Sequence, residues 1–187
     1  DFFAGNPFKA IPAMVISACM NTNPVMIYFG QELGEKGMDE EGFSGRDGRT
    51  TIFDYWTVDT IRRWRSGGKF DGKMLTKEEK KLQNFYSTLL NLCNKEKAIR
   101  EGVFFDLTYA NLEGIVFNEH KQYAFFRKAG KELIFIIVNF DEKPAAPCVK
   151  IPTHAFDYLG IPFKDNYKAK DLLTGNTETL VMAPDQC

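Results

Sequence analysis

The pattern of apolar and polar residues changes near the middle of the chain. Before residue 100, apolar residues recur mostly at three- and four-residue spacing, which is typical of helices. After Gly102, apolar and polar residues alternate in short segments, which is typical of half-buried strands. The pattern therefore predicts an N-terminal domain over residues 1–101 and a C-terminal β-domain over residues 102–187.

Helix signals are clearest in the first domain. Asn6 and Pro7 are typical of a helix start, with Asn as the N-cap and Pro at the first helical position. Apolar residues then recur at helical spacing up to Cys19. Pro12 requires that this helix begin near it or bend there. A short helix is predicted over residues 59–65.

The strongest predicted helix begins after Thr76. Thr76 and Glu79 have the spacing of a capping box, in which the hydroxyl and the carboxylate each accept a bond from a free backbone N–H. The residues that follow form one apolar stripe: Leu82, Phe85, Tyr86, Leu89, Leu92 and Cys93. Such a stripe predicts a helix packed on the core.

Short strands dominate the second domain. Alternation predicts a strand over residues 103–108, and residues 122–127 and 132–140 flank a glycine turn typical of a hairpin. Residues 134–138 are continuously apolar, which predicts a central strand. A helical turn at 153–160 precedes a second hairpin, formed by residues 168–173 and 177–182. Together these elements predict a small antiparallel sandwich.

One short apolar stretch stands apart from the helices around it. Residues 25–29 are continuously apolar and lie between Asn23-Pro24 and Gly30, which predicts a strand buried on both faces of a parallel sheet. Gln31 and Glu32 follow at once. In an α/β barrel the chemistry lies at this end of the strands, so a carboxylate here is a candidate site residue. The alternative is a buried strand followed by an ordinary polar loop.

Residues 23–32 resemble the last barrel strand of the α-amylase superfamily of glycoside hydrolases, whose familiar form is Gly-x-Pro-x-Ile-Tyr-Tyr-Gly-x-Glu. Asn23 and Phe29 replace a Gly and a Tyr of that form. Residues 82–90 resemble the last barrel helix, and residues 98–102 resemble the join to the C-terminal domain. The resemblance implies the terminal segment of a (β/α)8 TIM barrel, followed by a Greek-key-like β-sandwich.

The resemblance also implies a function for a longer parent protein. This is retaining hydrolysis of α-glucans such as starch or maltooligosaccharides, by two carboxyl groups roughly 5 Å apart. In the family, the nucleophile, the general acid and the third Asp, which lies in an Asn-His-Asp motif, all precede the last strand. This chain has no such motif, so no catalytic residue is assigned to it. We expect an inactive C-terminal fragment, whose partner is the upstream part of the same barrel.

The segment after the predicted strand supplies most candidate ligand contacts. Regular periodicity disappears over residues 33–55, and a loop of that length is often functional. Aromatic rings can stack on sugars, and charged groups can bond to hydroxyls. The predicted substrate-binding residues are Gln31, Glu32, Arg46, Arg49, Tyr55 and Trp56. A solvated loop anchored by its aromatic residues is the alternative.

Composition and charge limit the classes of partner that this chain is expected to bind. The net charge of −1 argues against nucleic acid, and no apolar run approaches the roughly 20 residues of a membrane span. The cysteines are widely separated and there are few histidines, so no metal site or cofactor is predicted in this chain. The resemblance leaves calcium open for the parent enzyme. A secreted or periplasmic location is expected if that parent degrades a polymer, and an unpaired strand at 25–29 would favour self-association.

Two other roles are open for the second domain. It is either a carbohydrate-binding module that presents Tyr109, Tyr123 or Tyr158, or a structural domain that packs against the barrel. Sugar-facing rings would have to be exposed, whereas rings in a structural domain would be packed.

Overall fold

The computed structural model describes residues 3, 5–35, 58–112 and 116–186. The chain divides into a first unit, residues 1–11 and 24–89, and a second unit, residues 12–23 and 90–187. Helices and antiparallel sheets are combined in the described residues, and these contain no barrel. The mixed helix and strand composition is confirmed, while the domain boundary after residue 101 stays a prediction.

The first unit is helical in its described part. Its elements are η1 (Pro7–Ala10), η2 (Gln31–Leu33), α2 (Asp59–Arg65), η3 (Ser66–Gly68) and most of α3 (Lys77–Lys95). Asn6 caps η1 as predicted, because its Oδ1 accepts the Phe8 N–H at 3.0 Å. η1 continues into α1 (Ile11–Cys19), so Pro12 lies in the first turn of that α-helix, where its missing N–H costs little.

The predicted capping box of α3 is confirmed. The Glu79 N–H donates to Thr76 Oγ1 at 3.2 Å, and the Thr76 N–H donates to Glu79 Oε2 at 2.8 Å. Three residues of the predicted apolar stripe are buried within the first unit: Leu82, Tyr86 and Leu89. The capping box therefore begins the helix, and the stripe holds it in the core.

The strand predicted at residues 25–29 is not present in this structure. The segment has no regular secondary structure up to Tyr28, a turn begins at Phe29, and it pairs with no strand of the described chain. Met26 is 84% exposed and Tyr28 is 49% exposed, whereas Val25, Ile27 and Phe29 are half-buried. Burial on both faces is therefore wrong for this chain, because such burial requires a neighbouring strand on each side.

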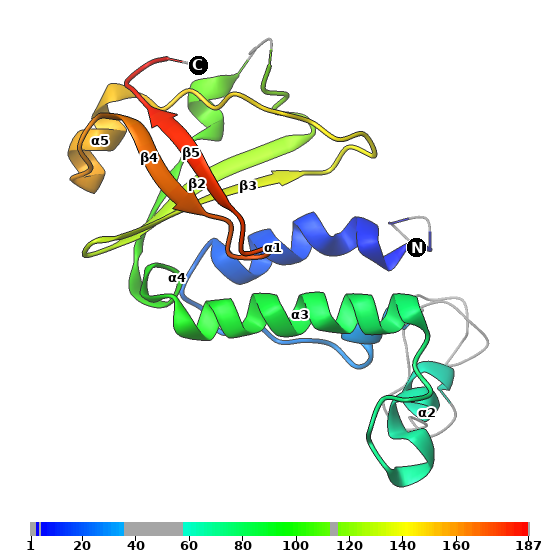
Figure 1. Ribbon diagram of the computed structural model, residues 1–187. Coiled ribbons are helices and arrows are strands. Elements are labelled where there is room, and N and C mark those ends of the chain that lie inside the picture. Colours follow the sequence, from blue (N-terminus) through cyan, green and yellow to red (C-terminus); the bar gives the residue numbers. More distant parts are fainter. Residues whose placement is uncertain (1–2, 4, 36–57, 113–115, 187) are drawn as a thin grey trace. The chain divides into compact units, whose positions relative to one another are not determined.

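The second unit contains all the described strands. They are β1 (Val103–Asp106), β2 (Gln122–Ala129), β3 (Glu132–Asn139), β4 (Lys164–Lys170) and β5 (Thr177–Met182). Its helices besides α1 are α4 (Lys97–Glu101), η4 (Thr108–Asn111) and α5 (Thr153–Leu159). The strands form an antiparallel three-stranded sheet in the order β1-β2-β3 and a separate antiparallel β4-β5 hairpin (Figure 1).

Both predicted hairpins are present, but the first strand of the second hairpin is Lys164–Lys170 and not 168–173, and one predicted strand position is wrong. β2 pairs with β3 from Gln122–Asn139 to Ala129–Glu132, and Gly130 occupies the turn with a φ of +57°. β2 is the central strand of the described sheet and β3 lies at its edge, which contradicts the prediction for residues 134–138. Ile136 and Val138 of this edge strand are buried and Ile137 is exposed. Apolar content therefore reports burial of side chains and not the number of paired neighbours.

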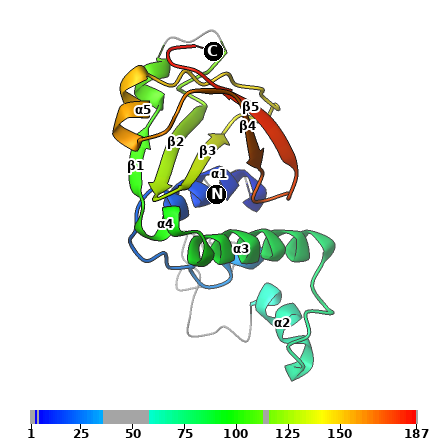
Figure 2. The same cartoon turned by 60° about the vertical axis from the view of Figure 1, so that its left-hand side comes forward.

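The core of the second unit lies between one face of the sheet, α5 and the β4-β5 hairpin (Figure 2). Its buried members are Leu107, Phe117, Ala124, Phe126, Ile151, Ala155, Phe156, Leu159, Ile161 and Met182. α5 contributes Ala155, Phe156 and Leu159 from one side and leaves His154 and Tyr158 exposed on the other. The antiparallel packing agrees with the predicted all-β character of this region, and the Greek-key sandwich itself stays a prediction.

A buried arginine occupies the other face of β2. Arg127 is 2% exposed and donates to the carbonyl oxygens of Met20, Ala98 and Ile99 at 2.9, 3.2 and 2.8 Å. These carbonyls lie just after α1 and within α4. One side chain therefore joins the sheet to α4 and to the segment that follows α1.

Cys19 and Cys93 also meet in the second unit. Cys19 is buried and Cys93 is half-buried. Their thiols share a hydrogen bond that, together with burial, raises the pKa of Cys19, whereas the same bond lowers the pKa of Cys93. The pair packs α1 against the end of α3.

Gly102 is expected to be intolerant of any side chain. It joins α4 to β1 with ordinary dihedral angles, φ −74° and ψ 160°. A Cβ there would lie 2.7 Å from the Lys128 carbonyl oxygen and even closer to that of Ala98. Gly102→Ala should therefore lower the free energy of unfolding by about 1–3 kcal/mol, measured by urea denaturation. The neighbouring exposed Glu101→Ala serves as control, and equal stability of the two variants would contradict the expectation.

Within the described part of the chain, every helix is too short or too polar to cross a membrane.

Candidate functional site

The turn after residues 25–29 is built around two glycines. η2 is flanked by Gly30 and Gly34, whose φ angles of +73° and +76° are left-handed. A Cβ on Gly30 would lie 2.7 Å from the Glu35 Cβ, and one on Gly34 would lie 2.8 Å from the Pro7 Cγ. Both positions therefore require glycine for backbone angle and for space, and together they fix where Gln31 and Glu32 lie.

Gln31 is held at both ends of its side-chain amide. Its Oε1 accepts the Tyr28 N–H at 3.1 Å, and its Nε2 donates to the Tyr86 hydroxyl of α3 at 3.0 Å. Burial raises the pKa of Tyr86; the bond from Gln31 opposes this shift and the negative charge of Glu32 adds to it. Gln31 and Glu32 thus lie next to Tyr86, and Gln31 ties the turn to α3.

The first unit contains a cleft of about 340 Å³ beside this turn. η1 and α3 supply apolar walls that include Phe8 and Leu82. The end of the turn and α2 supply polar groups, among them Glu35, Thr60 and Arg63. The Thr60 hydroxyl donates to the Glu35 carboxylate, which ties the turn to α2.

A two-pronged ion pair forms one wall of the cleft. Arg63 donates from Nε to both Glu79 carboxylate oxygens at 3.0 and 3.1 Å, and from Nη2 to Oε1 at 2.5 Å. Burial opposes ionisation of Glu79, but the bonds from Arg63 and Thr76 outweigh it and lower the pKa of Glu79. The bond to Glu79 raises the pKa of Arg63 in turn. Both groups stay charged near neutral pH.

Four carboxylates line the cleft, those of Glu35, Asp59, Glu78 and Glu79, and hydrogen bonds hold Glu35 and Glu79. Glu79 is fully engaged by Arg63 and the capping box, and the Glu35 carboxylate accepts the Thr60 hydroxyl. Neither carboxylate is placed as a proton donor for a reacting group. Among the residues described, no group of three or more His, Cys, Asp or Glu side chains is arranged to hold a metal ion. Calcium in a parent enzyme stays a prediction.

The predicted substrate-binding residues are only partly within the described structure. Gln31 and Glu32 lie together at the turn beside the cleft. The other four, Arg46, Arg49, Tyr55 and Trp56, fall outside the described residues. The cleft residues Glu35, Thr60 and Arg63 were not anticipated, because their contacts join segments whose sequence spacing shows no periodic relation.

The tyrosines considered for sugar binding separate into two environments. Tyr109 and Tyr158 are 46% and 62% exposed, and both rings contact the Phe105 ring. Tyr123 is half-buried and packs against Phe125 at a ring distance of 5.6 Å. The structure therefore brings Tyr109 and Tyr158 into one exposed cluster and leaves Tyr123 outside it.

Comparison of the chain with family models, with curated proteins and with solved structures found no match. A function is therefore inferred from the residues of this chain and from the motif resemblance described above.

Proposed function

We propose that this chain is the C-terminal part of a retaining, α-amylase-type glycoside hydrolase that acts on α-glucans such as starch or maltooligosaccharides. The observation that carries the proposal is the order of three family-like segments, at residues 23–32, 82–90 and 98–102. The unpaired stretch at 25–29 supports it, since barrel strands beside this stretch would cover Met26 and Tyr28. The upstream part of the same barrel is the proposed partner.

In this proposal the chain positions a site but does not carry the reaction. The nucleophile and the acid–base carboxyl group of a retaining hydrolase lie roughly 5 Å apart and would come from the upstream barrel. Gln31 would hold the strand end through its bonds to Tyr28 and Tyr86. Glu32 would act beside it at the barrel rim, where it helps to hold the site.

Activity is expected only in a longer protein. The isolated chain should release no reducing sugar from maltoheptaose, whereas a protein extended upstream through the Asn-His-Asp segment should release it at an enzyme-like rate. A reducing-end assay on both proteins measures the difference. Sequencing of the coding DNA upstream of this chain defines the extended protein to be expressed. Hydrolysis by the isolated chain, or an inactive extended protein, would contradict the proposal.

A structural role is the second candidate for residues 102–187. Arg127 favours it, because this buried side chain joins β2 to carbonyls of α4 and of the segment that follows α1. In that role the sheet stabilises the helices that precede it in the chain. Removal of the β-domain would then lower the melting temperature of the longer protein and leave its affinity for substrate unchanged.

A further inference from the structure

Four aromatic side chains gather at one edge of the second unit. We call Phe105, Tyr109, His154 and Tyr158 the aromatic platform. The Phe105 ring centroid lies 6.4 Å from that of Tyr109, 5.6 Å from that of His154 and 5.7 Å from that of Tyr158. Phe105 therefore contacts all three of the other rings, and the Tyr109 and His154 rings also contact each other at 6.2 Å.

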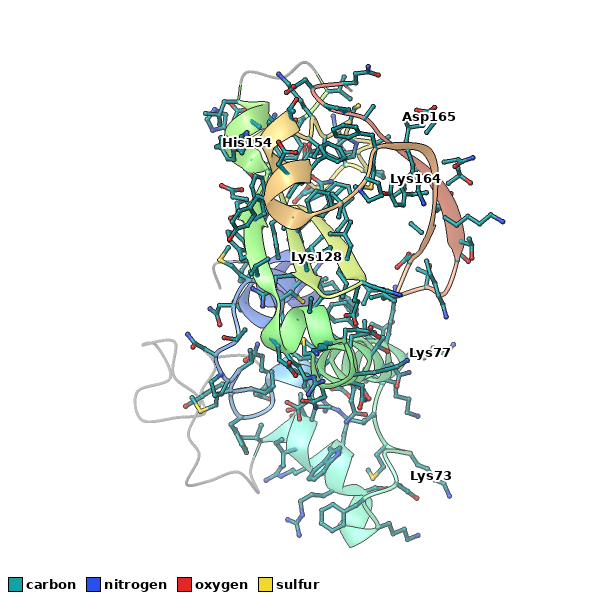
Figure 3. All side chains as sticks on the ribbon, turned by 90° about the vertical axis from the view of Figure 1, so that its left-hand side faces the viewer. Lys73, Lys77, Lys128, His154, Lys164 and Asp165 are labelled. Atoms are coloured by element: carbon teal, nitrogen blue, oxygen red, sulfur yellow. The ribbon has the colours of Figure 1, made fainter. Side chains whose placement is uncertain are left out.

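Three elements place these rings side by side. Phe105 comes from β1, Tyr109 from η4, and His154 and Tyr158 from α5. The last two are four residues apart, which puts them on the same side of the helix. Figure 2 shows α5 beside β1, and Figure 3 marks His154 on α5.

The outer rings are exposed although the helix beneath them is firmly packed. Ala155, Phe156 and Leu159 anchor α5 in the core. Tyr158 is 62% exposed and Tyr109 is 46% exposed, so large apolar ring surfaces remain in contact with water. The packed elements fix the backbone that carries these rings, so less conformational freedom is lost when a ligand binds.

Hydrogen-bonding groups lie at the edges of the rings. The Tyr109 hydroxyl and the His154 Nε2 share a hydrogen bond of 2.6 Å. Burial, aided by the charge of Asp106, raises the pKa of Tyr109, so its hydroxyl keeps its proton at neutral pH. Flat apolar faces bordered by hydroxyl and imidazole groups match a pyranose ring, which has an apolar C–H face and a rim of hydroxyls.

The size and charge of the platform favour a small neutral ligand. Its four side chains present much less area than the roughly 1,000 Å² that a specific protein interface needs. No Lys or Arg is among its members, as an anionic ligand would require. A sugar chain of a few residues satisfies both conditions.

We propose that the aromatic platform binds a short α-1,4-linked glucan, with glucose units stacked on Tyr109 and Tyr158 and a sugar hydroxyl bonded to the Tyr109 Oη, which His154 Nε2 orients. The choice of α-glucan among saccharides rests on the proposed function, whereas the platform as a sugar site does not depend on it. The platform lies outside the cleft and turn of the first unit, so it is a separate binding site in the second unit.

Titration calorimetry of the full 187-residue chain with maltoheptaose tests the proposal. We expect saturable binding that Tyr158→Ala and Tyr109→Ala each weaken at least tenfold, with cellohexaose binding at least tenfold more weakly than maltoheptaose. Phe140→Ala is the matched control. Phe140 is an exposed ring that follows β3, across the sheet from β1, and its removal should change the affinity less than twofold.

Several outcomes would overturn the inference. These are the absence of binding to maltoheptaose, equal binding of cellohexaose, or unchanged affinity in both tyrosine variants. Self-association of the chain that Tyr158→Ala abolishes would assign the platform to a second copy instead. Circular dichroism checks the fold, and Tyr158→Gln replaces Tyr158→Ala if the latter unfolds. Calorimetry on this chain tests the platform alone, and the reducing-end assay on the longer protein tests the proposed function alone, so failure of this inference is separate from failure of the proposed function.

Discussion

Replacing Arg127 with methionine is expected to lower the free energy of unfolding by about 2–5 kcal/mol, with a drop in melting temperature of about 10 °C. Arg127 is 2% exposed and holds carbonyl oxygens of Met20, Ala98 and Ile99. Methionine fills much of the same volume but donates no hydrogen bond. Urea denaturation followed by circular dichroism measures the loss.

The cost arises from carbonyl groups that lose a charged donor. The Ala98 oxygen also accepts the Gly102 N–H at 3.1 Å, so the expected penalty comes mainly from Met20 and Ile99. Each buried carbonyl left without a partner costs about 1–3 kcal/mol. Burial lowers the pKa of Arg127, which shows that the site opposes the charge that these carbonyls stabilise. Partial negative charge near helix C-termini favours a cation there.

Two further variants separate geometry from charge at this position. Arg127→Lys keeps the charge but offers a single nitrogen to three separated carbonyls, so an intermediate loss is expected. Lys128, whose half-buried side chain is marked in Figure 3, carries a neighbouring charge. Lys128→Met removes that charge and should lower the free energy of unfolding by less than about 0.5 kcal/mol. Equal losses for Arg127→Met and Lys128→Met would refute the role assigned to Arg127.

Elements with local signals were predictable from the sequence. α2 has the predicted bounds, because Ser66 and the glycines after it stop the helix at once. The capping box of α3 was readable from Thr76 and Glu79 alone, since both partners lie within one turn. The hairpin turn at Gly130 is also local. In each case the residues that determine the structure are neighbours in the chain.

Features that depend on distant partners were not predictable. Residues 25–29 carry the pattern of a doubly buried strand, but the described chain provides no strand to pair with them. β3 was expected to be central because residues 134–138 are apolar, yet the number of paired neighbours is decided by topology. The burial of Arg127 had no sequence signal either, because its carbonyl partners come from two other segments.

The residues of the candidate site were likewise predictable where their signal is local and not where it depends on distant partners. Gln31 and Glu32 were found because they follow an apolar stretch directly, whereas Arg63 and its partner Glu79 are separated by 16 residues and meet only through packing. The aromatic platform had a partial signal. His154 and Tyr158 have helical i,i+4 spacing within a predicted helical turn, but their contact with Phe105 required the fold.

Glu79→Ala is expected to lower the free energy of unfolding by about 2–4 kcal/mol at pH 7. The substitution removes the capping bond to the Thr76 N–H and leaves Arg63 without the carboxylate that accepts its bonds. Glu78→Ala is the matched control, since Glu78 is exposed and carries the same charge in the same helical turn. The control should cost less than about 0.5 kcal/mol. Chemical denaturation of both variants checks the contrast.

The same carboxylate predicts how stability changes with acid. The pKa of Glu79 is lower in the folded chain, so its contribution is complete above about pH 5 and is lost as the pH falls below about 4. The difference in unfolding free energy between the unchanged chain and Glu79→Gln should therefore be constant from pH 6 to 8 and shrink below pH 4. In an Arg63→Met background, the difference in unfolding free energy that Glu79→Gln causes should be smaller even at neutral pH. The reason is that Arg63→Met removes the charge that holds Glu79 ionised. A difference that is independent of both pH and Arg63 would mean that Glu79 acts through packing alone.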